Sequence, residues 1–223
     1  MRRSTLLIGL AATVVIAACT DPMEPDTGRQ PPDLAPWVWH LSADRTGDGA
    51  ADSELHIVEV SASAPPLETY EASFWACGWR SQTLLIRYAS VTDAASDVFM
   101  ELTIPRGSIR RWPSGRRFRW YHCVEVDVKI DPSHMVAQFE PGGLKFSSYR
   151  PARLTMWYSE ANFDLNGDGV VDVEDQIILD SELGIWRLPH ENGVWQKIGS
   201  VHTKDAKRFN AKLYQFSQYG VAY

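Results

Sequence analysis

Apolar and polar residues alternate over much of this chain, which is the pattern of β-strands with one buried face. The clearest run extends from residue 118 to residue 130 and ends at Asp131-Pro132. Its predicted inward face consists of Phe118, Trp120, Val124, Val126, Val128 and Ile130. Turn-forming residues separate such runs roughly every 8 to 15 residues, which predicts an all-β fold, an antiparallel β-sandwich.

The remaining elements follow from the same pattern. Strands are expected at 37–41, 55–60, 74–88 with a break at Gly78, 99–104, 152–158, 184–188, 194–198 and 208–213, with a closing segment to Tyr223. One short helix is expected, Val173 to Leu183, directly after a loop rich in aspartate. A polar stretch at 90–96 is a candidate seam between domains.

The first residues have the features of an export signal. Two arginines precede an apolar run, 6–18, which at 13 residues is too short to span a bilayer of ~30 Å. The sequence Ile16-Ala17-Ala18-Cys19 resembles the lipobox of bacterial lipoproteins. This resemblance implies cleavage before Cys19 and a diacylglycerol on its sulfur, whereas the alternative is an ordinary signal peptide with an incidental cysteine.

The segment after Cys19 reads as a tether, because it has four prolines between residues 20 and 35 and little large apolar surface. Thr20, in place of an aspartate, favours the outer membrane of a bacterial cell envelope, on its periplasmic or its surface face. The predicted parts are a leader at 1–18, a tether at 19–35, an N-terminal β segment at 36–95 that is separate or part of the same domain, and a sandwich at 96–223.

Charge and cysteine content agree with an exported protein that does not bind nucleic acid. Loss of two arginines with the leader leaves 20 Lys+Arg against 28 Asp+Glu, so the formal net charge changes from −6 to about −8. Cys77 and Cys123 remain after lipidation of Cys19, and an oxidising compartment permits a disulfide between them. Because Cys123 lies on the polar face of its predicted strand, a disulfide and two free thiols stay equally open.

The sharpest motif lies between residues 164 and 175. Oxygen-bearing side chains occupy loop positions 1, 3, 5, 9 and 12, Gly169 is at position 6, and position 7 offers a backbone carbonyl. The candidate calcium ligands are Asp164, Asn166, Asp168, Val170, Asp172 and Asp175. Four aspartates in 12 residues repel one another without a cation, which favours calcium over an ordinary Asp/Asn/Gly turn.

This motif resembles an EF-hand loop, and more closely the calcium loop of dockerin repeats, which end on aspartate as here at Asp175. Val171 is expected to pack beside the loop, and Leu179 and Leu183 continue the helix face of that resemblance. Neither an incoming helix nor a second repeat is present in the sequence, so the resemblance supports calcium and not cohesin binding. The segment Asp44 to Glu54 has similar spacing but lacks the last ligand, and is either a second, weaker site or a polar loop.

Two further features carry less information. Six arginines lie between residues 106 and 119. We expect a solvated loop whose positive charges interact with the acidic residues of the rest of the chain, and binding of anionic lipid headgroups or lipopolysaccharide is the alternative. The sequence contains no Gly-x-Ser-x-Gly or His-Glu-x-x-His motif, and His122 is expected to be a satisfied core residue. We therefore expect no enzymatic activity, although a carboxylate pair of an envelope hydrolase remains an alternative.

From Phe99 onward the chain resembles the ZU-five domain, a β-sandwich module of zonula-occludens proteins, ankyrins and netrin receptors. The segments that carry the resemblance are Leu102–Gly107, Phe139–Phe146, Pro151–Leu154, Tyr158, Trp195 and Phe216–Ala222. It implies a structural or adhesive role, with the loop and helix at 164–183 as an insertion. Some members cleave themselves at His-Phe-Ser; here Gln215 replaces the histidine, so no self-cleavage before Ser217 is expected.

Together these observations predict a lipid-anchored protein of the cell envelope, stabilised by calcium, that binds an envelope protein or polysaccharide. A dockerin-like component of a larger assembly is the alternative.

Overall fold

The computed structural model describes residues 55–89, 98–189 and 193–223. All of them belong to one unit, Ala35–Tyr223. The leader, Cys19, the tether, the predicted strand at 37–41 and the Asp44–Glu54 loop lie outside the described residues, as does the seam at 90–96. The predictions made for these segments stay predictions.

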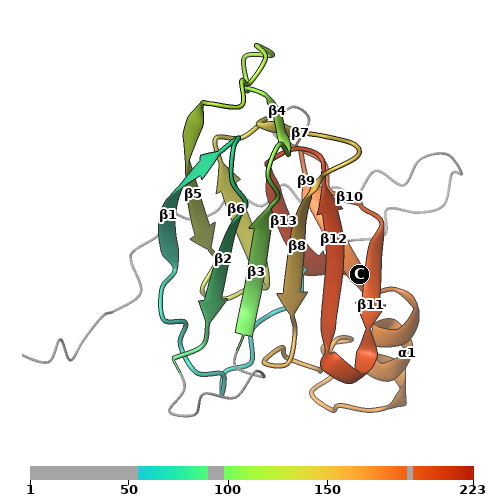
Figure 1. The fold of residues 1–223 in the computed structure, drawn as a ribbon. Coiled ribbons are helices and arrows are strands. Elements are labelled where there is room, and N and C mark those ends of the chain that lie inside the picture. Colours follow the sequence, from blue (N-terminus) through green and yellow to red (C-terminus); the bar gives the residue numbers. More distant parts are fainter. Residues whose placement is uncertain (1–54, 90–97, 190–192) are drawn as a thin grey trace, which may run out of the picture. The chain divides into compact units, whose positions relative to one another are not determined.

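The strands form two main antiparallel sheets, which confirms the all-β prediction (Figure 1). The six-stranded sheet has the order β1 (Glu71–Cys77), β5 (Cys123–Ile130), β6 (Val136–Glu140), β13 (Gln218–Ala222), β9 (Gly184–Leu188) and β10 (Gln196–Lys197). The five-stranded sheet has the order β11 (Ser200–Thr203), β12 (Arg208–Leu213), β8 (Ala152–Trp157), β3 (Val98–Ile104) and β2 (Gln82–Arg87). The short 3-10 helix η2, Lys204–Ala206, joins β11 to β12.

Alternating side chains from both sheets make the core. In β5 the valines at 124, 126 and 128 are buried while Glu125, Asp127 and Lys129 are exposed, as the period of two requires. In β8, Ala152, Leu154 and Met156 are turned inward in the same way. A stack of Phe139 on Phe216, with ring centroids 5.4 Å apart, fills the interior next to β13.

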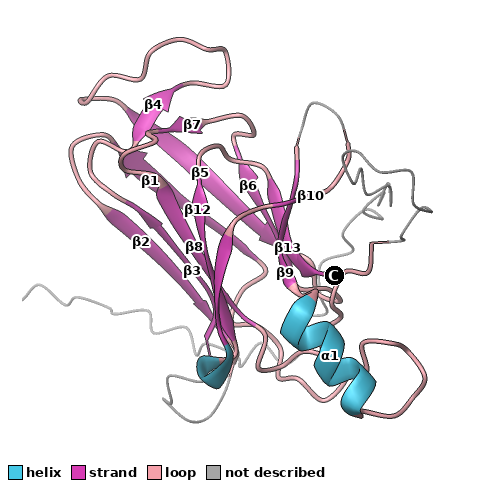
Figure 2. Cartoon of the chain, turned by 90° about the vertical axis from the view of Figure 1, so that its right-hand side faces the viewer, coloured by secondary structure: helices cyan, strands magenta, loops and turns pink. Residues whose placement is uncertain are grey.

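The two ends of the sandwich carry different structures, as Figures 1 and 2 both show. At one end β4 (Ile109–Arg111) pairs with β7 (Lys145–Phe146) in a small separate sheet. At the other end lies α1, Val173–Ser181, which follows the aspartate-rich loop and leads into β9. The predicted helix 173–183 is therefore confirmed, two residues shorter at its end.

The predicted long strand at 118–130 is wrong in its first part, because β5 begins only at Cys123. Phe118 instead pairs with the β4 segment, where its N–H donates to the Arg110 carbonyl oxygen at 2.8 Å, and residues 119–122 form a turn closed by the His122 N–H and the Arg119 carbonyl oxygen at 3.0 Å. Trp120 is 70% exposed and does not share the inward face. His122 is half-buried and its Nδ1 has no hydrogen-bond partner, so the expectation of a satisfied core histidine is also wrong.

The N-terminal segment joins both sheets. β1 pairs with β5 in one sheet and β2 pairs with β3 in the other, across the gap at 90–97. Residues 55–60 form isolated bridges, Ile57 to Ala222 and Val60 to Ala161, where a strand was expected. The described part of segment 36–95 is thus built into the same sandwich as the residues that follow.

Candidate metal site

The loop from Asn162 to Asp172 leads from the end of β8 to α1. Asp172 is the N-cap of α1: its Oδ1 accepts the Glu174 N–H at 2.8 Å. The Asp175 carboxylate reaches back and accepts the Asp172 N–H at 2.9 Å, which completes a capping box. The last two predicted ligands are therefore placed by the start of the helix.

Asp164 holds the turn at the centre of the loop. Its Oδ2 accepts the Gly169 N–H at 2.9 Å. Gly169 adopts φ +88°, a conformation that side chains with a Cβ rarely take, so the glycine at position 6 is required for this turn. The first ligand position and the glycine predicted from the motif are thus joined directly.

The middle of the loop is folded by its own side chains. The Asp168 N–H donates to Asn166 Oδ1 at 3.0 Å, and the Val170 N–H donates to Asp168 Oδ1 at 2.8 Å. Such turns place oxygen-bearing side chains at alternate positions on one side of the chain. Asn166 and Asp168 are exposed, and they also contact each other through Asn166 Nδ2 and Asp168 Oδ2 at 3.2 Å.

Asp175 is the most enclosed of the candidate ligands, with 3% of its surface exposed. Its Oδ1 accepts the Leu165 N–H at 2.6 Å and the Asn166 N–H at 3.0 Å. Hydrogen bonds from the Asp172 and Asn166 backbone outweigh desolvation and hold the pKa of Asp175 below its usual value. Its negative charge is therefore retained at the base of the loop.

One carboxylate oxygen in the loop lacks a partner. Asp164 Oδ1 is buried and accepts no hydrogen bond. A buried carboxylate oxygen without a hydrogen bond destabilises the fold unless a cation or a hydrogen-bond donor contacts it. The all-oxygen donor set and this orphaned oxygen both fit a hard cation such as calcium, which takes six to eight oxygen ligands.

The described residues contain no group of three or more His, Cys, Asp or Glu side chains already arranged to hold a metal ion. The six predicted ligands lie in one stretch of chain, residues 164 to 175, but the structure does not gather three of their carboxylates around one point. Backbone N–H groups of Leu165, Asn166 and Asp172 donate to the two oxygens of Asp175, so a cation bound by Asp175 would share these oxygens with the backbone donors.

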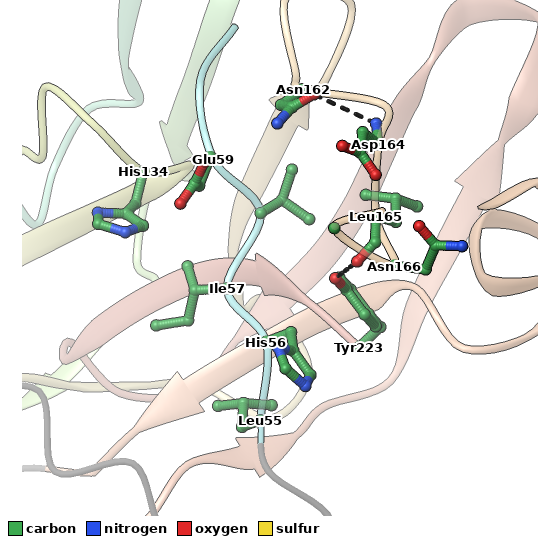
Figure 3. A pocket seen from close by; sticks show the side chains of 12 residues that line it. Leu55, His56, Ile57, Glu59, His134, Asn162, Asp164, Leu165, Asn166 and Tyr223 are labelled. Atoms are coloured by element: carbon green, nitrogen blue, oxygen red, sulfur yellow. Dashed lines mark hydrogen bonds between the residues drawn. The ribbon is translucent and has the colours of Figure 1, made fainter. Parts of the chain in front are cut away.

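A cleft of about 590 Å³ lies beside the loop (Figure 3). Asp164, Leu165 and Asn166 form one wall, and residues 55–59 form the opposite wall. The Tyr223 hydroxyl donates to the Leu165 carbonyl oxygen, and the His56 ring stacks on Tyr223 with centroids 5.3 Å apart. The loop is therefore fixed to the C-terminal residue of the chain.

Sequence reasoning missed the other residues of this cleft. His134 lines it, and its Nδ1 lies 3.3 Å from Asp131 Oδ1. The hydrogen bond to Asp131 raises the pKa of His134 despite its burial, and Glu59 adds to the effect. No local motif links residues 56, 59, 134 and 223, because only the bridges between distant segments bring them together.

The stretch of chain that carries the loop is rich in acidic residues. Between Arg153 and Arg187 the sequence has eight acidic residues and no lysine or arginine; they are Glu160, Asp164, Asp168, Asp172, Glu174, Asp175, Asp180 and Glu182. Burial raises the pKa of the nearby Tyr223 phenol, and the negative charges of Asp175 and Asp164 raise it further. Lys204 pairs with Asp180 at 2.7 Å, whereas within the described residues no ion pair involves the loop aspartates, whose negative charge favours a cation.

The apolar residues of the loop and helix are less buried than the dockerin resemblance implies. Val171 is 65% exposed and does not pack beside the loop. Leu183 is 8% exposed and Leu179 is half-buried, so the expected helix face contacts the core. Val170, Val173 and Ile177 are more than half exposed, which leaves an apolar surface around the acidic loop.

The two cysteines of the body form a disulfide. Cys77 and Cys123 are directly opposite each other in the β1–β5 register, with Cα atoms 4.0 Å apart. Sequence reasoning left this bond and two free thiols open. The bond fixes the end of β1 to the start of β5, at the end of the sandwich opposite to α1.

No family model matches the chain, no curated protein matches it, and no solved structure matches it. No helix within the described residues has both the length and the apolar character needed to cross a membrane.

Proposed function

We propose that this protein is a non-catalytic binding or scaffold protein of the bacterial cell envelope, anchored through lipid on Cys19 and stabilised by calcium in the 164–175 loop. Its partner is an envelope protein or polysaccharide. The observation that carries the calcium part is the loop itself, where the Gly169 N–H caps Asp164 Oδ2 and Asp164 Oδ1 is left buried without a partner.

Calcium in this loop would act as a structural staple. It would be held by side-chain oxygens of Asp164, Asn166, Asp168, Asp172 and Asp175 and by the Val170 carbonyl. The loop contacts the C-terminus through Leu165 and Tyr223 and continues into β9 through α1. Neutralising its aspartates would therefore stabilise the junction between the insertion and the six-stranded sheet.

Thermal unfolding with calcium and with chelator tests this proposal. A ligand at 100 times its Kd stabilises the folded state by about 2.7 kcal/mol. At roughly 2–4 °C per kcal/mol for a domain of this size, calcium should raise Tm by about 5 to 10 °C. Asp164→Asn should abolish this increase, because it replaces the charged carboxylate of the first ligand position with a neutral amide.

The same variant separates metal binding from simple damage to the fold. The amide oxygen of Asn can still accept the Gly169 N–H, so in chelator the variant should be at least as stable as the wild type. Asp205→Asn, on an exposed aspartate of η2, is the matched control and should keep the full calcium response. An unchanged wild-type Tm on adding chelator would refute the calcium part.

The anchoring part has a separate test. In a bacterial host that processes lipoproteins, the wild-type chain should partition into the detergent phase and gain the mass of a diacylglycerol on the N-terminal peptide. Cys19→Ser should move it to the aqueous phase. If the variant is cleaved at the same place and the wild type carries no lipid, the leader is an ordinary signal peptide.

A second candidate, a dockerin-like component of an assembly, is favoured by one observation. Val170, Val171, Val173 and Ile177 leave an exposed apolar surface on the loop and the first turns of α1. Pull-down from envelope extract with and without calcium tests it, using Val171→Ser with Ile177→Ser as the interface variant. Equal recovery of all bound proteins by wild type and variant would exclude docking through this surface.

A further inference from the structure

The end of the sandwich that carries β4 and β7 is strongly basic, although the chain as a whole has a formal net charge of −6. Three segments meet there, 78–81, 105–122 and 141–151, joined by Gly107 N–H to Gly78 O at 2.9 Å and Ser147 N–H to Ser108 O at 2.8 Å. They contain no Asp or Glu. Their basic residues are Arg80, Arg106, Arg110, Arg111, Arg116, Arg117, Arg119, Lys145 and Arg150.

The arginines of 106–119 are not neutralised by acidic residues. All six are exposed, and within the described parts of the chain none forms an ion pair with a carboxylate. Arg111 donates to the Gly115 carbonyl oxygen at 3.1 Å, and Arg119 donates to the Tyr121 hydroxyl at 2.9 Å. The expectation that these arginines pair with the acidic residues of the rest of the chain is therefore wrong for the described residues.

Aromatic side chains are interleaved with these arginines. A cleft of about 850 Å³ is lined by Arg110, Arg116, Arg117 and Arg119 together with a row of rings. The row runs from Trp112 over Phe118, with centroids 4.9 Å apart, to His122, Tyr121 and Trp120. Its outer members are exposed, Trp120 by 70% and Tyr121 by 52%, and Trp79 is 46% exposed beneath Arg80.

The backbone holds Trp120 outward. A Cβ on Gly78 would lie 2.7 Å from the Trp120 carbonyl oxygen, so only glycine permits this close approach. The Gly78 N–H donates to the His122 carbonyl oxygen at 3.0 Å, and the Cys77–Cys123 disulfide lies one residue beyond each partner. Trp120 and Tyr121 are thus presented by a fixed turn.

We propose that this basic and aromatic end, centred on Arg116, Arg117, Arg119, Trp120 and Tyr121, docks on an anionic phospholipid surface. Guanidinium groups pair with phosphate through two parallel hydrogen bonds. Indole and phenol rings are stabilised at the level of the headgroups, where one edge is apolar and the other is wet. A soluble polyanion would engage the arginines alone, whereas a lipid interface engages both kinds of side chain.

This site lies at the opposite end from the acidic loop, and it requires neither calcium nor lipid on Cys19. It is therefore tested with a chain that begins at Thr20, which keeps every described strand, the helix and both core clusters. The probe is binding to vesicles of 30% phosphatidylglycerol in phosphatidylcholine, compared with pure phosphatidylcholine, in the presence of chelator. Sedimentation gives the partition coefficient.

Binding to the anionic vesicles alone is expected, with a fall at 0.5 M salt. Each basic side chain near such a surface contributes a factor of about five, so Arg116→Gln with Arg117→Gln should weaken partitioning roughly 25-fold. Lys129→Gln with Lys207→Gln removes the same charge from exposed positions at the opposite end of the sandwich and should change it by less than about threefold. Trp120→Ser should weaken binding without changing its salt dependence.

Three results would overturn the proposal. The first is equal binding to neutral and anionic vesicles. The second is an equal loss in the Lys129/Lys207 control, which would show a net-charge effect. The third is no vesicle binding together with tight binding to soluble polyphosphate, which would show that the basic end binds a soluble polyanion and not a lipid surface. Because all arms contain chelator and lack Cys19, none of these outcomes bears on the calcium loop or the anchor.

Discussion

Removal of the Cys77–Cys123 disulfide should destabilise the body by a predictable amount. The bond closes a loop with a sequence separation of 46 residues. Chain-entropy arguments give about 4 kcal/mol at 25 °C for a loop of this length, and measured losses for native disulfides are usually about 2 to 5 kcal/mol. We expect Cys77→Ala with Cys123→Ala to lower the free energy of unfolding by about 2 to 4 kcal/mol.

Urea unfolding of the chain that begins at Thr20 measures this loss. With a slope of roughly 2 kcal/mol per molar urea, the midpoint should fall by about 1 to 2 M. Reductant should shift the wild type by a similar amount and leave the double variant unchanged. A loss below about 0.5 kcal/mol, or an equal effect of reductant on both proteins, would show that the disulfide does not stabilise the body.

Removal of the disulfide should also have a local effect on amide exchange. Because the bond lies next to the contact of Gly78 with Trp120, its removal should speed amide exchange in residues 118–124 more than in the 164–175 loop. Uniform acceleration of exchange at both ends would show that the bond acts only on the unfolded chain.

Three further predictions follow from single contacts. Gly78→Ala should lower the free energy of unfolding by about 1 to 3 kcal/mol because its Cβ would meet the Trp120 backbone, while Gly199→Ala, with nothing within 4 Å, should stay within about 0.5 kcal/mol in the same urea assay. The hydrogen bond to Asp131 raises the pKa of His134 in the folded protein, so the stabilisation from protonated His134 is present below pH 6.5 and is lost as the pH rises through the pKa of the folded state. His134→Gln should therefore flatten the fall in the free energy of unfolding between pH 6 and pH 8. An unchanged slope in this variant would contradict the prediction. The full chain should stay uncut at Ser217, whose hydroxyl donates to the Leu188 carbonyl oxygen, and a fragment beginning at Ser217 on a denaturing gel would show otherwise.

Local pattern predicted most of the strands and the helix. The alternation in 124–130, the apolar positions of 208–213 and the Asp-rich loop before Val173 each specify their element within a few residues. The same rule failed at Phe118–His122, where alternation continues but the chain turns. There the backbone of Trp120 lies against Gly78, a contact between residues 42 positions apart that no local pattern contains.

The short strands were missed for a related reason. β4, β7 and β11 have two to four residues, too few to show a period, and they exist only because a partner lies beside them. The candidate ligands of residues 164–175 come from spacing alone, because one stretch of chain supplies all of them, and their binding of calcium stays a prediction. The cleft beside them was not predicted, because His56, Glu59, His134 and Tyr223 come from four separate segments.

Calorimetric titration of the metal-free chain with calcium measures directly whether the 164–175 loop binds this ion. We expect saturable binding with a Kd below about 1 mM, in the range of extracellular calcium sites. Asp164→Asn should reduce the stoichiometry by one calcium per chain, and Asp205→Asn should not change it. Absence of binding at 5-fold this concentration, about 5 mM calcium, or the same stoichiometry in Asp164→Asn and wild type, would show that the loop is not a calcium site.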